Sequence, residues 1–272
     1  WEAVGGSVLI VDPATGEILA LACWPPYDPN RYWSYPKEWW LNSAVSCCFE
    51  PGSIFKIVVA TAAIEEGVAR PGQVVAFCRG QQQIGNRVIH CAVHGRGGHG
   101  QMDVVEVVVK SCNIGAAHLA RRLGPERLYR YIRRFGFTRA TNLGLLAEAD
   151  GQVSKPSEWT PIVLANVAFG QSITATPSQL VAAYCSIANG GLLPWPHLIK
   201  RVEGRNGQRG LSFHPVLRRV CSQRTAQLMS RILQEVVIRG TGKAAKVPGY
   251  RAAGKTGTAQ KPTPQAGMAS GK

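Results

Sequence analysis

Acidic residues are scarce in this chain, and so are long apolar runs. Of 272 residues only 16 are Asp or Glu, against 31 Lys or Arg, which gives a formal net charge of +15 at pH 7. The longest apolar run extends from Ile57 to Ile64 and is interrupted by Thr61. A membrane-spanning helix needs roughly 20 apolar residues. The sequence therefore predicts no transmembrane segment of its own.

Other features are missing as well. Near Trp1 there is no initiator methionine, basic n-region or apolar h-region, so we expect any targeting segment to lie outside this sequence. Eight cysteines are too few for a disulfide scaffold. A hydrophobic content of 45% and a charged content of 17% exclude disorder as the main state. We find no internal repeat or low-complexity linker, and expect one domain over residues 1–272.

The excess positive charge makes anionic partners conceivable. However, the densest basic block alternates with leucine, isoleucine and phenylalanine at helical spacing. This pattern predicts a solvated helix face whose alkyl stems cover the core. No nucleic-acid-binding motif accompanies it, so we expect no nucleic-acid partner. The block contains Arg121, Arg122, Arg127, Arg130, Arg133, Arg134 and Arg139.

The pattern of apolar residues and turns predicts an α+β domain whose terminal strands meet in one sheet. The segment after Gly52 is apolar nearly all round, which is typical of a helix in the middle of a domain. Residues 70–101 are polar and are expected to form a loop or insertion. Strands are expected at 7–11, 17–22 and 250–260, and helices after caps at Asp103, Thr176 and Ser222.

Three short motifs carry the candidate chemistry: Ser53-Ile-Phe-Lys56, Ser111-Cys-Asn113 and Lys255-Thr-Gly257. Each motif is weak alone, since a second Ser-x-x-Lys occurs at Ser34 in an aromatic loop without helical periodicity. Ser53, by contrast, opens the apolar helix. Its position at a helix start offers unpaired amides and a positive dipole end to an oxyanion.

Lys56 lies three residues after Ser53, so both side chains share one helix face. Apolar neighbours and other cations should lower the pKa of Lys56 toward that of a usable base. Ser53 would then be a nucleophile with its own base. The alternative that Ser53 only caps the helix while Lys56 snorkels stays open for this motif alone.

The other two motifs supply polar groups whose use depends on the fold. The Ser111 hydroxyl could pass a proton between Lys56 and a leaving amine, and the Asn113 amide could hold a substrate carbonyl. Lys255 and Thr256 offer a cation and a hydroxyl to a substrate carboxylate. The simpler alternatives are a helix cap for Ser111-Cys-Asn113 and a surface lysine beside a bulge for Lys255.

The order of the motifs resembles the set known from penicillin-binding proteins and serine β-lactamases. From Gly6 to Gln260 the chain is similar to the transpeptidase domain of class B penicillin-binding proteins, also through Glu50-Pro-Gly and Phe169-Gly-Gln-Ser. It looks most like the division-type septal enzymes, because the elongation type usually has aspartate at the position of Asn113.

The resemblance implies an α+β penicillin-binding-protein transpeptidase or serine β-lactamase-like fold, with an antiparallel sheet and helices packed on both faces. In the family two further strands and a closing helix follow the Lys-Thr-Gly strand. They do not follow Lys255 here, so we expect a transpeptidase domain that is incomplete at its C-terminus, with a polar insertion at about 70–101.

The resemblance also implies a reaction. Ser53 would attack the D-alanyl-D-alanine carbonyl of a peptidoglycan stem peptide, and the acyl group would pass to an amine of a neighbouring stem peptide. Lys56, Ser111, Asn113 and Lys255 would complete the catalytic set without a cofactor. Thr256, Gly257 and Thr258 would bind substrate, with the amides of Ser53 and Thr258 as oxyanion hole.

By the same resemblance β-lactam antibiotics would acylate Ser53. Expected partners are a membrane glycosyltransferase and division proteins, at the outer face of the cytoplasmic membrane. One alternative is a serine β-lactamase, which needs a carboxylate or modified lysine to activate water. Glu148, Asp150 and Glu158 lie in the relevant interval without the expected pattern. A non-catalytic β-lactam-binding or scaffold module is the other alternative.

Cysteine and histidine are concentrated in the polar insertion. Cys78, Cys91, His94 and His99, with His90, have a density compatible with a zinc site. A disulfide between Cys78 and Cys91 would suit an oxidising envelope. Free cysteines and surface histidines are the simplest interpretation. Cys112, beside Ser111, is expected to be a small core residue.

Overall fold

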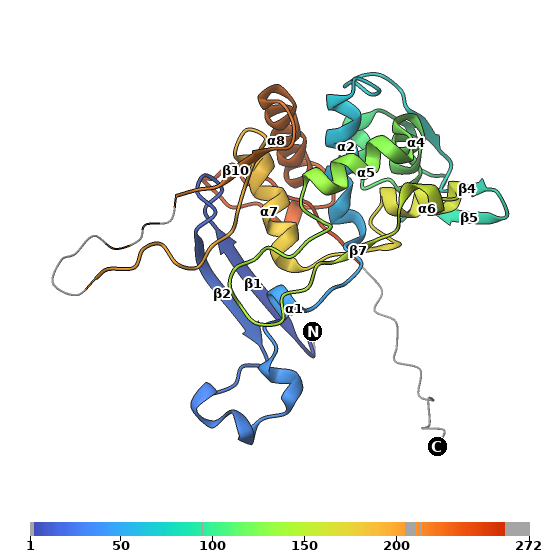
Figure 1. Ribbon diagram of the computed structural model, residues 1–272. Helices are drawn as coiled ribbons and strands as arrows, with labels where there is room; N and C mark the ends of the chain where they lie inside the picture. Colours follow the sequence, from blue (N-terminus) through green and yellow to red (C-terminus); the bar gives the residue numbers. More distant parts are fainter. Residues whose placement is uncertain (1–2, 94, 205–209, 211, 213, 259–272) are drawn as a thin grey trace, which may run out of the picture.

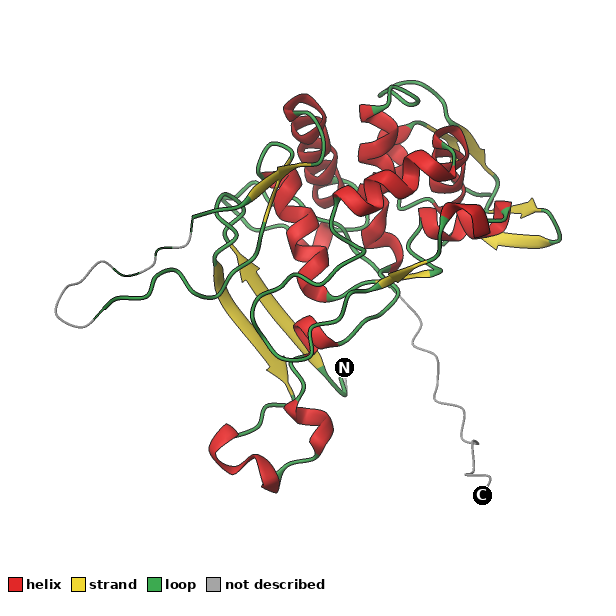
Figure 2. Ribbon diagram, viewed as in Figure 1, coloured by secondary structure: helices red, strands yellow, loops and turns green. Residues whose placement is uncertain are grey.

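The computed structural model describes residues 3–93, 95–204, 210, 212 and 214–258 (Figure 1). Most of the helices gather in one part of the molecule, and the strands lie around them in pairs, while the helical turns after β2 lie apart (Figure 2). Within the described ranges every sheet is an antiparallel pair. In that same part of the chain, no helix has both the length and the apolar character to cross a membrane.

The N-terminal hairpin forms as predicted. Strands β1 (Gly6–Val11) and β2 (Ile18–Trp24) pair antiparallel. The turn between them is held by Asp12, whose side chain accepts a hydrogen bond from the Ala14 N–H over 2.7 Å. One face of β1 packs against the helices α1 (Ser43–Ser46) and α7 (Pro177–Ala188). The aromatic segment after β2 forms two 3-10 turns, η1 (Pro29–Ser34) and η2 (Lys37–Trp40).

The predicted central helix is confirmed, with a tighter first turn than expected. A 3-10 turn, η3 (Gly52–Phe55), leads directly into α2 (Lys56–Glu65). All α2 residues from Lys56 to Ala63 are buried, because other helices surround them. These neighbours are α3 (Val104–Val109), α4 (Asn113–Leu123), α5 (Pro125–Arg134) and α8 (Gln223–Ile238).

The caps predicted from the sequence begin their helices. Thr176 forms a complete capping box with Gln179 at the start of α7, and the Ser222 hydroxyl accepts the Thr225 N–H at the start of α8. Asp103 caps α3, but its capping-box partner Glu106 pairs with Arg239 and Lys110. A further helix, α6 (Pro161–Ala168), begins after Thr160.

The arginine-rich block forms the expected solvated face. On α4 and α5 the side chains of Arg121 and Arg133 are exposed, whereas Leu128 and Ile132 are completely buried. The alternation of basic and apolar residues thus reflects helix amphipathicity.

The expectation of a loop at 70–101 was wrong in part, because four short strands lie there. β3 (Ala76–Cys78) pairs with β6 (Gly100–Met102), and β4 (Gln81–Ile84) forms a hairpin with β5 (Arg87–His90) that projects beside α6 (Figure 1). The remaining elements are short: β7 (Gln152–Val153), η4 (Pro156–Glu158), β8 (Ile173–Thr174), β9 (Leu192–Pro194), β10 (Leu217–Arg219) and η6 (Lys243–Ala245).

The strand predicted at 250–260 is wrong for residues 250–258, and 259–260 lie outside the described residues. A strand requires a ladder of hydrogen bonds to a neighbour. Here the Gly254 N–H donates to the Leu233 carbonyl, 3.2 Å away in α8, and no described strand pairs with the segment. Its predicted meeting with the N-terminal hairpin in one sheet is therefore not found among the described residues.

Candidate active site

The three motifs, far apart in sequence, converge at the start of α2. The Lys56 Nζ lies 2.8 Å from the Ser53 Oγ. It also lies 3.2 Å from the Ser111 Oγ and 2.7 Å from the Asn113 Oδ1. From the third motif, the Lys255 Nζ donates to the Ser111 Oγ over 2.8 Å. A hydroxyl, two amines, a second hydroxyl and a carboxamide thus form one continuous network.

Lys56 is the centre of this network and is 1% exposed. Burial, followed by repulsion from Lys255, lowers the pKa of Lys56 to about 7. Its ammonium has three protons for four acceptors, the fourth being the Ser111 carbonyl at 2.7 Å. A neutral amine can instead accept the Ser53 proton, so this lysine is suited to act as a general base near neutral pH.

Ser111 lies between the two lysines in a strained backbone conformation. It occupies the junction of α3 and α4 with a φ of +55°, in the left-handed region that non-glycine residues rarely adopt. Such conformations persist where surrounding contacts hold them, and they are concentrated at functional sites. Here the contacts are the hydrogen bonds from Lys56 and Lys255 to its hydroxyl.

Asn113 begins α4 and is held from both ends of its amide. Its Oδ1 accepts from Lys56, and its Nδ2 donates to the His90 carbonyl over 2.9 Å. Asn113 also lines a groove of about 670 Å³ between β5 and α6, together with Phe169 and Gln171. Asn113 is half-buried where it lines this groove.

Residues 255–258 lie against the turn that carries Ser53. A Cβ added to Gly257 would lie 2.8 Å from the Ile54 Cγ2, and one added to Gly52 would lie 2.6 Å from the Thr258 carbonyl oxygen. Glycine is therefore needed on both sides of this contact. The Thr256 hydroxyl donates to Thr241, over 2.8 Å. Desolvation lowers the pKa of Lys255 to about 8.

The carboxylates considered for a hydrolase face other groups. Glu148 accepts from the Thr141 hydroxyl, and Asp150 accepts from the Ala140 N–H. Glu158 is exposed at the end of η4. Among the described residues no carboxylate hydrogen-bonds to Ser53 or Lys56. The second Ser-x-x-Lys serine, Ser34, is exposed in η1.

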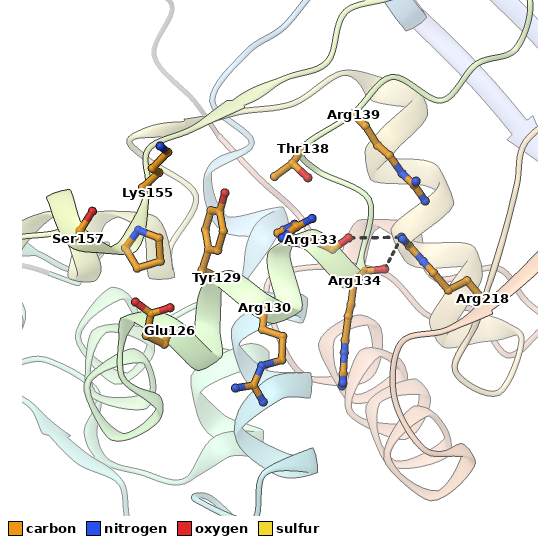
Figure 3. A pocket seen from close by; sticks show the side chains of 11 residues that line it. Glu126, Tyr129, Arg130, Arg133, Arg134, Thr138, Arg139, Lys155, Ser157 and Arg218 are labelled. Carbon is orange, nitrogen blue, oxygen red and sulfur yellow. Dashed lines mark hydrogen bonds between the residues drawn. The ribbon is translucent and has the colours of Figure 1, made fainter.

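A separate basic groove of about 710 Å³ follows α5 (Figure 3). The guanidinium of Arg218 donates there to the carbonyls of Arg133 and Arg134, at the C-terminal end of the helix. The residues that line this groove include none of the three motifs. We therefore do not assign it to the active site.

The zinc candidates of the insertion come together only in part. Cys78, Cys91 and His99 cluster, whereas His90 is exposed and His94 lies outside the described residues. The fourth member of the cluster is Cys112. Cys112 is completely buried, as expected of a core residue, but the sequence analysis missed its place in the cluster. Its position inside the Ser111-Cys-Asn113 motif was the available signal.

Comparisons with known proteins show what the chain is similar to. The family described as "Penicillin binding protein transpeptidase domain" matches residues 6–271. Penicillin-binding protein PbpB of Mycobacterium tuberculosis is 39% identical over 96% of the chain, and peptidoglycan D,D-transpeptidase FtsI of Escherichia coli is 32% identical over 97%. The chain spans only 39% and 42% of these two relatives.

Solved structures show the same fold. Penicillin-binding protein 3 of Mycobacterium tuberculosis, in complex with aztreonam, superposes with a TM-score of 0.88 at 38% identity. The match covers 97% of this chain and 60% of that one. The fold class expected from the sequence is thereby confirmed.

Proposed function

We propose a function from one established premise: the chain belongs to the penicillin-binding protein transpeptidase family. We infer that it provides the acyl-transfer site of a peptidoglycan D,D-transpeptidase and that β-lactams acylate the same serine. Residues 1–272 would belong to one transpeptidase domain. The observation that carries the proposal is the network in which Lys56 bridges Ser53, Ser111 and Asn113.

In the proposed acylation, the Ser53 Oγ attacks the carbonyl between two D-alanines while its proton passes to neutral Lys56. The developing oxyanion is stabilised by the amides of Ser53 and Thr258. Ser111, which contacts both lysines, relays the proton to the departing D-alanine amine. The C–N bond breaks as the leaving group takes this proton.

In the second step, an amine of a neighbouring stem peptide attacks the acyl-enzyme. The relay runs in the opposite direction: the attacking amine loses its proton through Ser111 to Lys56, and Ser53 is released as a hydroxyl. In the first step, before D-alanine leaves, Lys255 and Thr256 would bind the donor's terminal carboxylate, and Asn113 would bind its peptide amide. No cofactor takes part in this scheme.

A hydrolytic function is less well supported. Deacylation by water requires a group that activates the water. Glu148 and Asp150 are engaged with residues 140 and 141, and among the described residues no carboxylate hydrogen-bonds to Ser53 or Lys56 as a base for water. We infer that a bound β-lactam would therefore remain attached for a long time. The intact network also argues against a non-catalytic scaffold.

The proposed activity sets the location and partners of the protein. Its substrates, peptidoglycan stem peptides, lie outside the cytoplasmic membrane, so the site would face that compartment. A membrane glycosyltransferase that supplies glycan strands, and proteins of the division machinery, would be its partners. Asn113, rather than aspartate, supports the division role.

The test is release of D-alanine from a stem pentapeptide by the intact protein, with an added amine as acceptor. Wild type should release D-alanine and form the cross-linked product. Ser53→Ala should lose both, whereas Ser34→Ala, in the exposed second Ser-x-x-Lys, should retain both. Product formation that survives in Ser53→Ala, or depends on Ser34, would overturn the proposal.

A further inference from the structure

Three cysteines and one histidine meet beside the active site. Cys78 ends β3, Cys91 follows β5, His99 precedes β6, and Cys112 precedes α4. Their four ligand atoms all lie within 4.8 Å of one another. The three cysteines are buried, and His99 is half-buried. The side chains come from separate segments, so sequence proximity alone does not explain the cluster.

Three of the six separations between these atoms are close to the edges of a metal-centred tetrahedron, and all six are within 4.8 Å. Zinc–sulfur bonds of about 2.3 Å and zinc–nitrogen bonds of about 2.0 Å give edges of about 3.8 Å between sulfurs and about 3.5 Å between sulfur and nitrogen. The Cys91 and Cys112 sulfurs are 3.8 Å apart. The His99 Nδ1 lies 3.4 Å from the Cys91 sulfur and 3.7 Å from the Cys78 sulfur.

We propose that Cys78, Cys91, His99 and Cys112 bind one structural zinc ion. Three thiolates and an imidazole are a donor set that selects zinc among common divalent ions. Four protein ligands complete the tetrahedron and leave no open position, so the ion is structural rather than catalytic. The Gly115 N–H donates to the Cys112 sulfur over 3.3 Å, a backbone contact of the kind that orients a metal-bound thiolate.

A disulfide is the main competing use of these thiols. It requires two sulfurs to approach to about 2.05 Å, and only one pair can form at a time among three cysteines. The 3.8 Å separation of the Cys91 and Cys112 sulfurs fits shared metal coordination without such movement. In addition, a disulfide gives the His99 Nδ1, which lies 3.4 Å from the Cys91 sulfur, no role in the cluster.

The ion would connect the insertion to the active-site asparagine. Cys112 stands between Ser111 and Asn113, and Cys91 follows His90, whose carbonyl accepts from the Asn113 amide. Zinc would therefore hold both backbone segments that position Asn113. This consequence for acylation depends on the proposed function, whereas the binding of zinc does not.

The first measurement is metal content. The intact protein, purified without chelator, should contain about one zinc ion per chain, measured by inductively coupled plasma mass spectrometry. Cys78→Ser removes a ligand that is not part of the three motifs and should lose the zinc. Cys185→Ser, at a buried cysteine outside the cluster, should keep it. Ser53→Ala should also keep it, which separates this proposal from the proposed function.

The second measurement does not depend on a variant that might misfold. After removal of zinc by a chelator, Co²⁺ added to wild type should give the intense thiolate charge-transfer absorption and visible bands of a tetrahedral thiolate site. β-Lactam acylation should slow on chelation and recover with zinc. The proposal would be overturned if the purified protein contains no metal and gives no such spectrum with Co²⁺. It would also be overturned if peptide mapping finds a disulfide among these cysteines.

Discussion

The pH dependence of Ser53 acylation tests the role of Lys56 quantitatively. If the neutral Lys56 amine accepts the Ser53 proton, acylation requires its deprotonated form. Because burial lowers its pKa to about 7, the rate should rise with pH through that value. Above about 8 it should fall again, as Lys255 loses the charge that binds a carboxylate. The account therefore predicts a bell-shaped profile with its maximum between these values.

The expected magnitude follows from the neutral fraction of Lys56. With a pKa of about 7, the neutral fraction is about one tenth at pH 6 and about one hundredth at pH 5. The logarithm of the acylation rate should thus fall with a slope of about one below neutrality. A lysine with the ordinary pKa of about 10.4 would be only about one part in a thousand neutral at pH 7.4.

A variant separates the two causes of the lowered pKa of Lys56. Lys255→Gln removes the repulsion between the two amines but leaves most of the burial, which is the larger cause. The acid limb of the profile should move to higher pH while staying below the range of an exposed lysine. The overall rate should also fall, because the cation that binds the carboxylate is lost.

The assay is the second-order rate of labelling by a fluorescent penicillin between pH 5 and pH 9. Circular dichroism at each pH serves as the control for folding. A rate that still rises tenfold per pH unit at pH 9 would refute a lowered pKa at Lys56. An acid limb that does not move in Lys255→Gln would refute the coupling of the two lysines.

Two further substitutions test the packing around the site. Gly257→Ala should slow labelling, because its Cβ would lie 2.8 Å from the Ile54 Cγ2. Adding Ile54→Ala should restore part of the labelling rate. The control Gly254→Ala, whose Cβ meets no atom within 4 Å, should change the rate little. No recovery in the double variant would reject the steric explanation. Ser222→Ala removes the cap of α8 and should lower the free energy of unfolding, measured in urea, by about 1 kcal/mol. An unchanged midpoint of urea unfolding would contradict the role of the cap.

Local rules predicted most of the helices correctly. Thr176 and Ser222 mark helix starts because their hydroxyls satisfy unpaired backbone amides, a contact within a few residues. The apolar run after Gly52 predicted a buried helix for a similar reason, since only packing on several sides covers such a helix. These features depend on short stretches of chain, and the sequence displays them directly.

The partners of a segment in space were harder to predict. Residues 250–258 were predicted as a strand whose small side chains let another backbone approach, but a strand depends on a neighbouring backbone, which composition does not specify. The short strand pairs within 70–101 were missed because their polar surfaces lack the usual alternation. The sequence analysis also did not place Cys112 beside the insertion, because neither segment alone specifies a contact with a distant one. The motif that contains Cys112 was nevertheless recognised.

In the proposed mechanism Ser53 is the nucleophile of a network formed with Lys56, Ser111 and Lys255. The most direct test of this role is peptide mapping by mass spectrometry of the intact protein after treatment with benzylpenicillin. The account predicts a penicilloyl adduct on the peptide that contains Ser53 and no adduct in Ser53→Ala. An adduct on Ser34, Ser111 or any other residue of the wild-type protein would contradict it.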